Sequence, residues 1–267
     1  MPAELRLVPA SAEVGTGRVH SVYRSTVNFT LDGKLFSLQD SLAECSPISF
    51  VAAQPALPPC KVGQRAVWDG HRLQIGTSVF DAGSAKRFSG RLPAARRLSL
   101  PQELRLPASP TLFGGSCASD TEARQLCSRT AQALLRGDWL AAAEAACGML
   151  GLGCGLTPSG DDWLCGLLAL LHFAAVRVDT AAFLSALCSR LSVRLHETND
   201  VSARFLEAAC AGSFSAPLCA LFCAWNNADA DAFDCAVLRL LRLGHSSGAD
   251  TLEGIRFIYH HLNSGRE

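Results

Sequence analysis

The spacing of hydrophobic residues changes part-way along the chain, and this change limits the folds that are open to it. Up to about residue 107, apolar and polar residues alternate, as at Val27, Phe29 and Leu31, which is the pattern of a half-buried strand. Further on they recur every three or four residues, which is the pattern of an amphipathic helix. A β-rich half followed by a helical half is typical of an α+β fold and argues against alternating βαβ units.

The first half, residues 1–107, is predicted to be an antiparallel β-rich domain that forms a sheet or small barrel of about six to eight strands. Two dipeptides, Asp32-Gly33 and Asp69-Gly70, lie between alternating segments and are favoured in tight hairpin turns. The segments PISFVAA and TSVFDAG add further short strands.

The second half, residues 108–267, is predicted to be an all-α domain of about eight helices. Four hydrophobic stripes have helical spacing, including one at residues 164–171. Asp138, Asp179 and Asp231 stand where helix N-caps or first-turn acids are expected.

Composition and charge exclude several classes of protein. Hydrophobic residues make up 49% of the chain and charged residues 18%, as in a folded globular protein. The formal net charge is +0 at pH 7, so we expect no nucleic-acid partner. The N-terminus lacks the pattern of a secretory signal, and the longest apolar run, Trp163–Val178, is too short and too polar to span a bilayer. Because the 12 cysteines include no Cys-x-x-Cys pair, we expect reduced thiols in a cytoplasmic protein without a membrane partner.

The densest group of glycine and polar residues is GLGCGLTPSGDDW, Gly151–Trp163, which leads into the longest apolar run. Ser159 and Asp162 match the Ser-x-x-Asp capping box, in which each side chain accepts a hydrogen bond from the other residue's backbone N–H. Capping does not account for the alternating glycines or for the second carboxylate, Asp161. Alternating glycines let backbone amides turn toward a ligand, and a helix N-terminus adds partial positive charge. We therefore interpret the segment as a site for a phosphate or carboxylate.

A second segment, GHSSGADTLEG, repeats this pattern 88 residues later. The residues Ser, Gly, Asp, Leu and Gly fall at five of eight matching positions, 159–166 in one copy and 247–254 in the other. We infer that two helix N-termini converge on one pocket and donate amides to an anionic ligand. The alternative is that the segments look alike only because helix capping uses few residue types.

Two residues of these segments are candidate catalytic groups. Asp161 would position or activate a neighbouring group, and His245 would transfer a proton or stabilise an oxyanion. A third polar segment, TNDVS, lies at the start of another predicted helix. The predicted substrate-binding residues are Gly153, Gly155, Thr157, Ser159, Gly160, Asp162, Thr198, Asn199, Ser202, Ser246, Ser247, Gly248 and Asp250.

Three segments, GLGCGLTPSGDDWLCGLL, TNDVSARFLEAACAG and LGHSSGADTLEGI, resemble the AllH family in their order and spacing. This family is named for a subunit of bacterial oxamate carbamoyltransferase. The resemblance is specific over about residues 145–260 and general over the first half. It implies a role in allantoin and purine breakdown, where oxalurate and phosphate give oxamate and carbamoyl phosphate. It also implies that the chain acts with two other subunits, which are relatives of FdrA and AllG. The family commonly has proline where this chain has Cys154.

These observations favour a carbamoyltransferase subunit that binds a small anionic substrate at helix N-termini and needs no cofactor. Two alternatives stay open. In the first, the protein is a Mg²⁺-dependent hydrolase in which Asp161, Asp162 and Asp250 hold the metal. In the second, it is a non-catalytic scaffold or regulatory subunit whose glycine-rich loop binds a metabolite.

Overall fold

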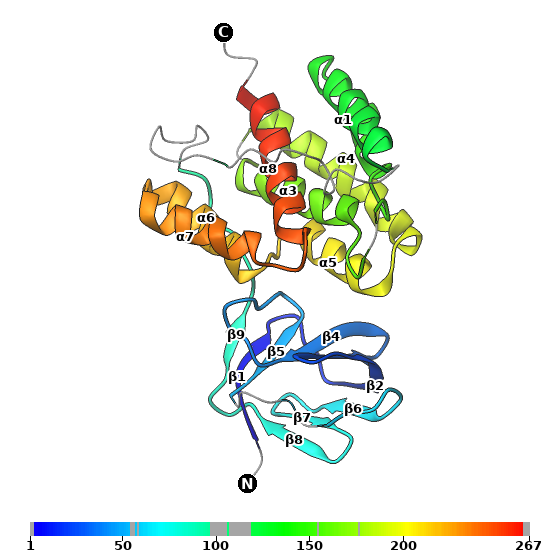
Figure 1. Ribbon diagram of the computed structural model, residues 1–267, viewed down its shortest axis with the longest axis vertical. Coiled ribbons are helices and arrows are strands. Elements are labelled where there is room, and N and C mark those ends of the chain that lie inside the picture. Colours follow the sequence, from blue (N-terminus) through cyan, green and yellow to red (C-terminus); the bar gives the residue numbers. More distant parts are fainter. Residues whose placement is uncertain are drawn as a thin grey trace. The chain divides into compact units, whose positions relative to one another are not determined.

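The computed structural model describes residues 3–53, 57, 59–96, 106, 119–153, 155–175 and 177–263 (Figure 1). The chain divides into two compact units, residues 1–90 and residues 91–267. The described strands belong to the first unit and the described helices to the second, which confirms the predicted α+β fold. The boundary predicted between residues 107 and 108 lies outside the described residues.

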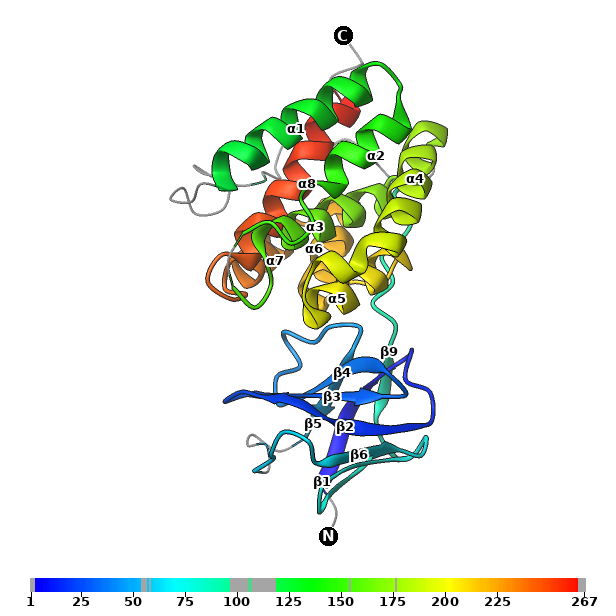
Figure 2. The same ribbon diagram turned by 90° about the vertical axis from the view of Figure 1, so that its right-hand side faces the viewer.

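The strands of the first unit are β1 (Ala3–Pro9), β2 (Gly15–Val22), β3 (Thr26–Leu31), β4 (Lys34–Gln39), β5 (Ser49–Ala52), β6 (Arg65–Trp68), β7 (Arg72–Ile75), β8 (Ser78–Asp81) and β9 (Lys86–Phe88). Their order is β5-β4-β3-β2-β6-β7-β8-β1-β9, and β1 also pairs with β5. This last pairing closes eight strands into a small barrel, and β9 lies along β1 beyond β8 (Figure 2). Most pairings are antiparallel, as predicted, but β4–β5, β1–β8 and β1–β9 are parallel.

Both predicted turn dipeptides connect adjacent antiparallel strands. Asp32 and Gly33 have φ values of 45° and 81°, as a two-residue type I′ turn between β3 and β4 requires. Gly70, with a φ of 95°, lies in the link between β6 and β7. The Asp69 carboxylate accepts hydrogen bonds of 2.8 and 2.6 Å from two backbone N–H groups that follow it. The local sequence therefore sets these two hairpins.

Aromatic side chains fill the barrel. Phe29, Phe36, Phe50 and Trp68 are at most 1% exposed, and their ring centroids lie 5.1–6.3 Å apart. The interior of an eight-stranded barrel is just wide enough for side chains to fill it. This cluster is the hydrophobic core of the first unit.

The helices of the second unit are α1 (Ser119–Leu135), α2 (Trp139–Cys147), α3 (Ser159–Phe173), α4 (Val178–Arg194), α5 (Asp200–Cys210), α6 (Ala216–Asn227), α7 (Ala230–Leu241) and α8 (Ser247–Asn263), with the 3-10 turn η2 (Leu195–Glu197) before α5. Asp138 is the N-cap of α2, and Asp179 and Asp231 lie in the first turns of α4 and α7, as predicted. Helix α3 is central, since 12 of its 15 residues are buried. It packs against α4, α5 and α8 (Figure 1).

Helices α3 and α8 approach each other most closely at two glycines. A Cβ atom on Gly166 would lie 1.9 Å from the carbonyl oxygen of Thr251, and one on Gly254 would lie 2.0 Å from that of Trp163. Only glycine, which has no Cβ, permits so close an approach of two backbones. The two contacts are equivalent, because Gly254 and Thr251 stand 88 residues after Gly166 and Trp163. The crossing therefore has local two-fold symmetry.

The likeness extends to two local features of the neighbouring helices, by which we define α1–α2–α3 and α6–α7–α8 as two copies of a repeat. In each copy a residue with positive φ follows the first helix, Gly137 (70°) in one and Ala228 (52°) in the other. The next residue is an N-cap aspartate. Asp138 and Asp229 each accept a 3.0 Å hydrogen bond from the backbone N–H three residues further on. The short repeat in the sequence is thus part of a repeat of three helices.

Two global properties concern the described residues only. Among them, no helix is long and apolar enough to cross a membrane. The cysteines that the structure describes are all free thiols.

Candidate functional site

The loop between α2 and α3 contains three glycines with left-handed backbone conformation. Gly151, Gly153 and Gly155 have φ values of 71°, 109° and 113°, which other residue types rarely adopt. A Cβ on Gly151 would also lie 2.7 Å from the carbonyl oxygen of Glu197, in η2. The alternation of glycines is therefore required by the path of the loop.

The predicted capping box of Ser159 and Asp162 is wrong. Helix α3 begins at Ser159 itself, its N-cap is Pro158, and no side chain caps it. The backbone N–H groups of Asp161 and Asp162 donate to the Pro158 carbonyl at 3.0 and 3.2 Å. Ser159 does not cap because it lies one position inside the helix, where it is buried next to Gly153.

Asp161 connects this loop to the segment that precedes α5. Its side chain is buried; Oδ1 accepts a 2.8 Å hydrogen bond from the Gly151 N–H, and Oδ2 accepts one from the Thr198 hydroxyl. Burial raises the pKa of Asp161, while the hydrogen bonds from Gly151 and Thr198, together with the nearby Ser202 hydroxyl, lower it in part. The structure thus brings three predicted site residues together, and both carboxylate oxygens of Asp161 have partners within the chain.

Asn199 has a structural role at the start of α5. Its side-chain oxygen accepts hydrogen bonds from the backbone N–H groups of Val201 and Ser202 at 3.1 and 3.0 Å. This is an N-cap, which accounts for the asparagine without a ligand.

The starts of α3 and α8 lie side by side, as the repeated segment predicts. The Oγ1 of Thr157 and the Oγ of Ser247 are 2.8 Å apart. Asp162 belongs to the same group, because hydrogen bonds with Ser247 and Thr157 lower its pKa. Burial has the larger effect and raises the pKa of Asp162 to about 7, with a contribution from the nearby carboxylates of Asp250 and Asp161. At neutral pH this carboxyl is therefore present in both its protonated and its ionised form.

The backbone amides around the motif fall into two groups. Those of Gly151, Gly160 and Gly248 donate hydrogen bonds within the chain, the last two to the carbonyls of Leu152 and Leu243 at 2.8 and 3.3 Å. A second group has no hydrogen-bond partner among the described residues, namely the amides of Gly153, Gly155, Leu156 and Thr157. An anion at this place would meet the amides of the loop rather than those of Gly160 and Gly248.

His245 and Ser246 lie in the turn before α8. His245 is exposed, and no hydrogen bond joins it to Asp162, Thr157 or Ser247 in the part of the chain that the structure describes. The carbonyl of Ser246 accepts a 2.9 Å bond from the N–H of Asp250 and so begins the helix. Asp250 itself is buried in the first turn of α8.

Two family models match the chain. One, described as oxamate carbamoyltransferase subunit AllH, matches residues 149–259. The other, the AllH family N-terminal domain, matches residues 4–87. The chain belongs to the AllH family. No solved structure matches it.

The two matches follow the two units of this AllH-family chain. The N-terminal match covers most of the barrel. The other match begins next to the glycine loop and runs from there through α3 to α7 and most of α8. The description of the family indicates a subunit of oxamate carbamoyltransferase, and therefore a protein that works with partner subunits on small substrates.

No group of three or more His, Cys, Asp or Glu side chains within the described ranges is arranged to hold a metal ion. The alternative of a Mg²⁺-dependent hydrolase stays a prediction. Asp161, one of its three proposed ligands, already accepts hydrogen bonds at both oxygens.

One residue of the loop was not predicted as part of the site, and one predicted feature lies outside the structure. Leu156, whose side chain is 63% exposed, contributes one of the amides without a partner. Its position between Gly155 and Thr157 could have indicated that it belongs to the site, because in such a loop the backbone and not the side chain faces a ligand. The substitution at Cys154 lies outside the described residues.

Proposed function

We propose that this AllH-family chain is a subunit of an oxamate carbamoyltransferase and binds the anionic group of the substrate where α3 and α8 begin. The reaction converts oxalurate and phosphate to oxamate and carbamoyl phosphate. The family match supports the reaction class. The observation that carries the location is the 2.8 Å contact between Thr157 and Ser247, which joins the glycine loop to the start of α8.

Donors at this place suit a small planar anion. Two helix N-termini carry partial positive charge, and the loop adds the amides that have no partner among the described residues. Hydrogen bonds between such amides and a carboxylate or phosphate are stronger than bonds between neutral groups. The carboxyls of Asp162 and Asp250 oppose an anion when they are charged. With a pKa of about 7, Asp162 can bind a proton at neutral pH, which removes one negative charge and supplies an O–H donor.

Each acidic residue then has a separate role. Asp161 is a positioning residue, because its two oxygens hold the Gly151 amide and the Thr198 hydroxyl. Asp162 is the carboxyl that would orient the amide nitrogen of the substrate, since its buried Oδ2 has no hydrogen-bond partner among the described residues. His245 would stabilise the carbonyl oxygen in the tetrahedral transition state.

The proposed partners are the FdrA-like and AllG-like subunits, in a cytoplasmic pathway of allantoin and purine breakdown. A subunit of a larger enzyme needs its partners to complete the catalytic site. Activity is therefore expected from the complex and not from this chain alone.

The experiment that tests this proposal is co-purification of the three subunits, followed by an assay for carbamoyl phosphate formed from oxalurate and phosphate. The double variant Thr157→Val, Ser247→Ala is expected to lose most of the activity, because it removes the contact that joins the two helix starts. Thr130→Val is the matched control, since Thr130 is a buried threonine whose hydroxyl donates, among the described residues, only to the Leu126 carbonyl, at 2.8 Å.

Absence of carbamoyl phosphate from an intact three-subunit complex would contradict the reaction. A fully active complex that contains the double variant would contradict the location. A scaffold or regulatory subunit would instead bind oxalurate without turnover even when the partner subunits are restored.

A further inference from the structure

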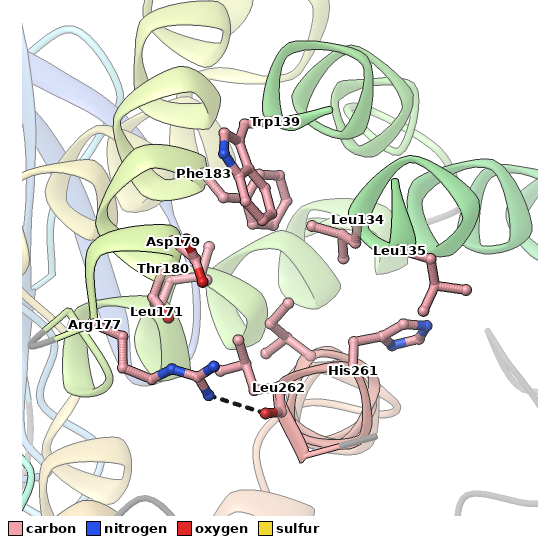
Figure 3. Close-up of a pocket in the computed structure, with 11 residues that line it drawn as sticks. Leu134, Leu135, Trp139, Leu171, Arg177, Asp179, Thr180, Phe183, His261 and Leu262 are labelled. Atoms are coloured by element: carbon pink, nitrogen blue, oxygen red, sulfur yellow. Dashed lines mark hydrogen bonds between the residues drawn. The ribbon is translucent and has the colours of Figure 1, made fainter. Parts of the chain in front are cut away.

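A pocket of about 210 Å³ lies at the ends of α3 and α8 that are far from the glycine loop (Figure 3). It is lined by residues of α1, α2, α3, α4 and α8 and by Arg177 just before α4, all in the second unit. None of the residues of the proposed substrate site lines it. It is smaller than pockets for drug-sized ligands, which measure roughly 300–1,000 Å³, so it suits a small molecule.

One side of the pocket is apolar. It is lined by one side chain from each of α1, α2, α3, α4 and α8, namely Leu134, Trp139, Leu171, Phe183 and Ile258. Figure 3 shows the side chains of Leu134, Trp139 and Phe183 that line this pocket. A hydrocarbon chain placed here would be removed from water, which favours binding by about 25 cal/mol for each Å² of apolar surface buried.

The other side is formed by the start of α4 and is polar. Arg177 is the N-cap residue of this helix, and no side chain caps the helix with a hydrogen bond. The Nη1 of Arg177 donates a 2.9 Å hydrogen bond to the carbonyl of Leu262, which fixes the guanidinium at the pocket (Figure 3). Since a guanidinium has five N–H donors, others stay available for a ligand.

Thr180 gives an independent indication that this side receives a polar group. Its side chain lines the pocket and the residue is 1% exposed. Within the described part of the chain, its hydroxyl has no hydrogen-bond partner. A buried hydroxyl without a partner is unfavourable, and an acceptor on a ligand would satisfy it.

Two other titratable groups line the pocket. Asp179 is exposed to solvent, so water and salt screen its repulsion of an anion. His261 has its Nδ1 2.7 Å from the carbonyl of Phe257. A carbonyl can only accept, so Nδ1 carries the hydrogen and donates. The guanidinium, the hydroxyl and the uncapped start of α4 together favour a negatively charged ligand group at this side.

We propose that this pocket binds a small monocarboxylate with a short apolar chain. The carboxylate accepts hydrogen bonds from Arg177, from the Thr180 hydroxyl and from the first amides of α4. The apolar chain of the ligand lies between Leu134, Trp139 and Phe183. This site is separate from the proposed carbamoyltransferase site and does not depend on that assignment.

The test is a ligand-observed NMR titration of the full chain with isovalerate, and with isovaleramide as its uncharged counterpart. Isovalerate is expected to bind saturably, and isovaleramide at least about tenfold more weakly, because it lacks the charge that pairs with Arg177. Thr180→Val keeps the shape and removes the hydroxyl, so isovalerate affinity should fall by about two- to tenfold. Arg177→Gln should lower it by at least about tenfold.

Thr130→Val and Arg190→Gln are the matched controls. Thr130 is a buried helical threonine and Arg190 an exposed arginine of α4, and neither lines the pocket. Both should leave isovalerate affinity unchanged. If Arg177→Gln fails to fold because the bond to Leu262 is lost, Arg177→Lys and Thr180→Val carry the test. Absence of saturable isovalerate binding, equal binding of the amide, or unchanged affinity in Thr180→Val would each overturn the proposal.

Discussion

The two three-helix copies share one frame and differ in the loop before their last helix. In both, a glycine near the start of that helix packs on a backbone carbonyl of the preceding segment. A Cβ on Gly160 would lie 1.9 Å from the oxygen of Met149, and a Cβ on Gly248 would lie 1.6 Å from that of Leu240. The connecting loops are unequal, since residues 148–158 join α2 to α3 and only residues 242–246 join α7 to α8.

This difference separates residues that pack helices from residues that are available to a ligand. Gly160 and Gly248 occur in both copies and have a packing role in each. Gly153 and Gly155 belong to the longer loop alone, and their amides have no partner in the described ranges. The shared frame does not need them, so the longer loop is the part of the repeat to test for function.

The largest loss of stability is expected from a substitution that forces α3 and α8 apart where they cross. Gly166→Ala places a Cβ 1.9 Å from a backbone oxygen, so the helices must separate and stability should fall by about 3 kcal/mol or more. Gly155→Ala adds the same atom with nothing nearer than 3.8 Å, and its cost, from backbone strain alone, is about 1 kcal/mol. Urea denaturation measures both. Equal losses would mean that the crossing is not tight.

A smaller loss is expected from Asp161, which occurs in the first copy only, because Ala249 stands at the matching position. Asp161→Asn replaces one acceptor oxygen by a donor, so either the Gly151 N–H or the Thr198 hydroxyl loses its partner. Stability should fall by about 2.5 kcal/mol. Asp231→Asn, which changes a first-turn acid of α7, is the control and should cost less than about 1 kcal/mol. A similar loss in both would show that Asp161 does not hold the loop.

The titration of the buried Asp162 carboxyl should make the free energy of unfolding depend on pH. Its pKa is raised from 3.8 to about 7 in the folded chain, so the folded state binds the proton more tightly than the unfolded state does. The contribution of the protonated Asp162 to the free energy of unfolding is complete at pH values below the pKa of the unfolded chain. It is lost as the pH rises through the pKa of the folded chain. Between pH 5 and pH 7 the loss from this group should be about 2 kcal/mol.

Asp162→Asn removes this titration. The variant should therefore have a flatter profile of unfolding free energy against pH than the unaltered chain, measured by urea denaturation at several pH values. An unchanged profile would mean that Asp162 is ionised throughout this range.

The smallest effect tests whether the two copies are equivalent. Asp138→Ala and Asp229→Ala each remove one 3.0 Å N-cap bond, and each should cost about 1 kcal/mol. Asp231→Ala, which removes a first-turn acid with no capping bond to its own helix, should cost less. Thermal unfolding would measure the series, and clearly different costs for the two N-caps would limit the symmetry to the crossing itself.

Local patterns were sufficient for the fold class because the alternation of apolar residues and the turn at Asp32-Gly33 depend on near neighbours. Closure of the barrel could not be predicted, because it depends on the pairing of β1 with β5. The repeated segment correctly indicated that two helix starts meet, at Thr157 and Ser247.

The limits of prediction in the site have two physical causes. Helix α3 begins one residue earlier than the capping box requires, so Ser159 lies inside the helix instead of capping it. Sequence patterns do not resolve helix ends to one residue. The pocket with Arg177 and Thr180 on one wall is assembled from residues far apart in the sequence. No local motif marks such a combination.

The position of β1 in the barrel has a consequence for the order in which the first unit can fold. This strand is synthesised before the other strands of the unit, but its partners come later in the chain: Leu5 pairs with Ala52, Ala3 with Phe80 and Leu7 with Lys86. Contacts so distant along the chain slow folding, because the intervening segment must be ordered before they form. During synthesis one edge of β1 therefore stays unpaired until β5 has emerged, and the other edge until β8 and β9 have emerged.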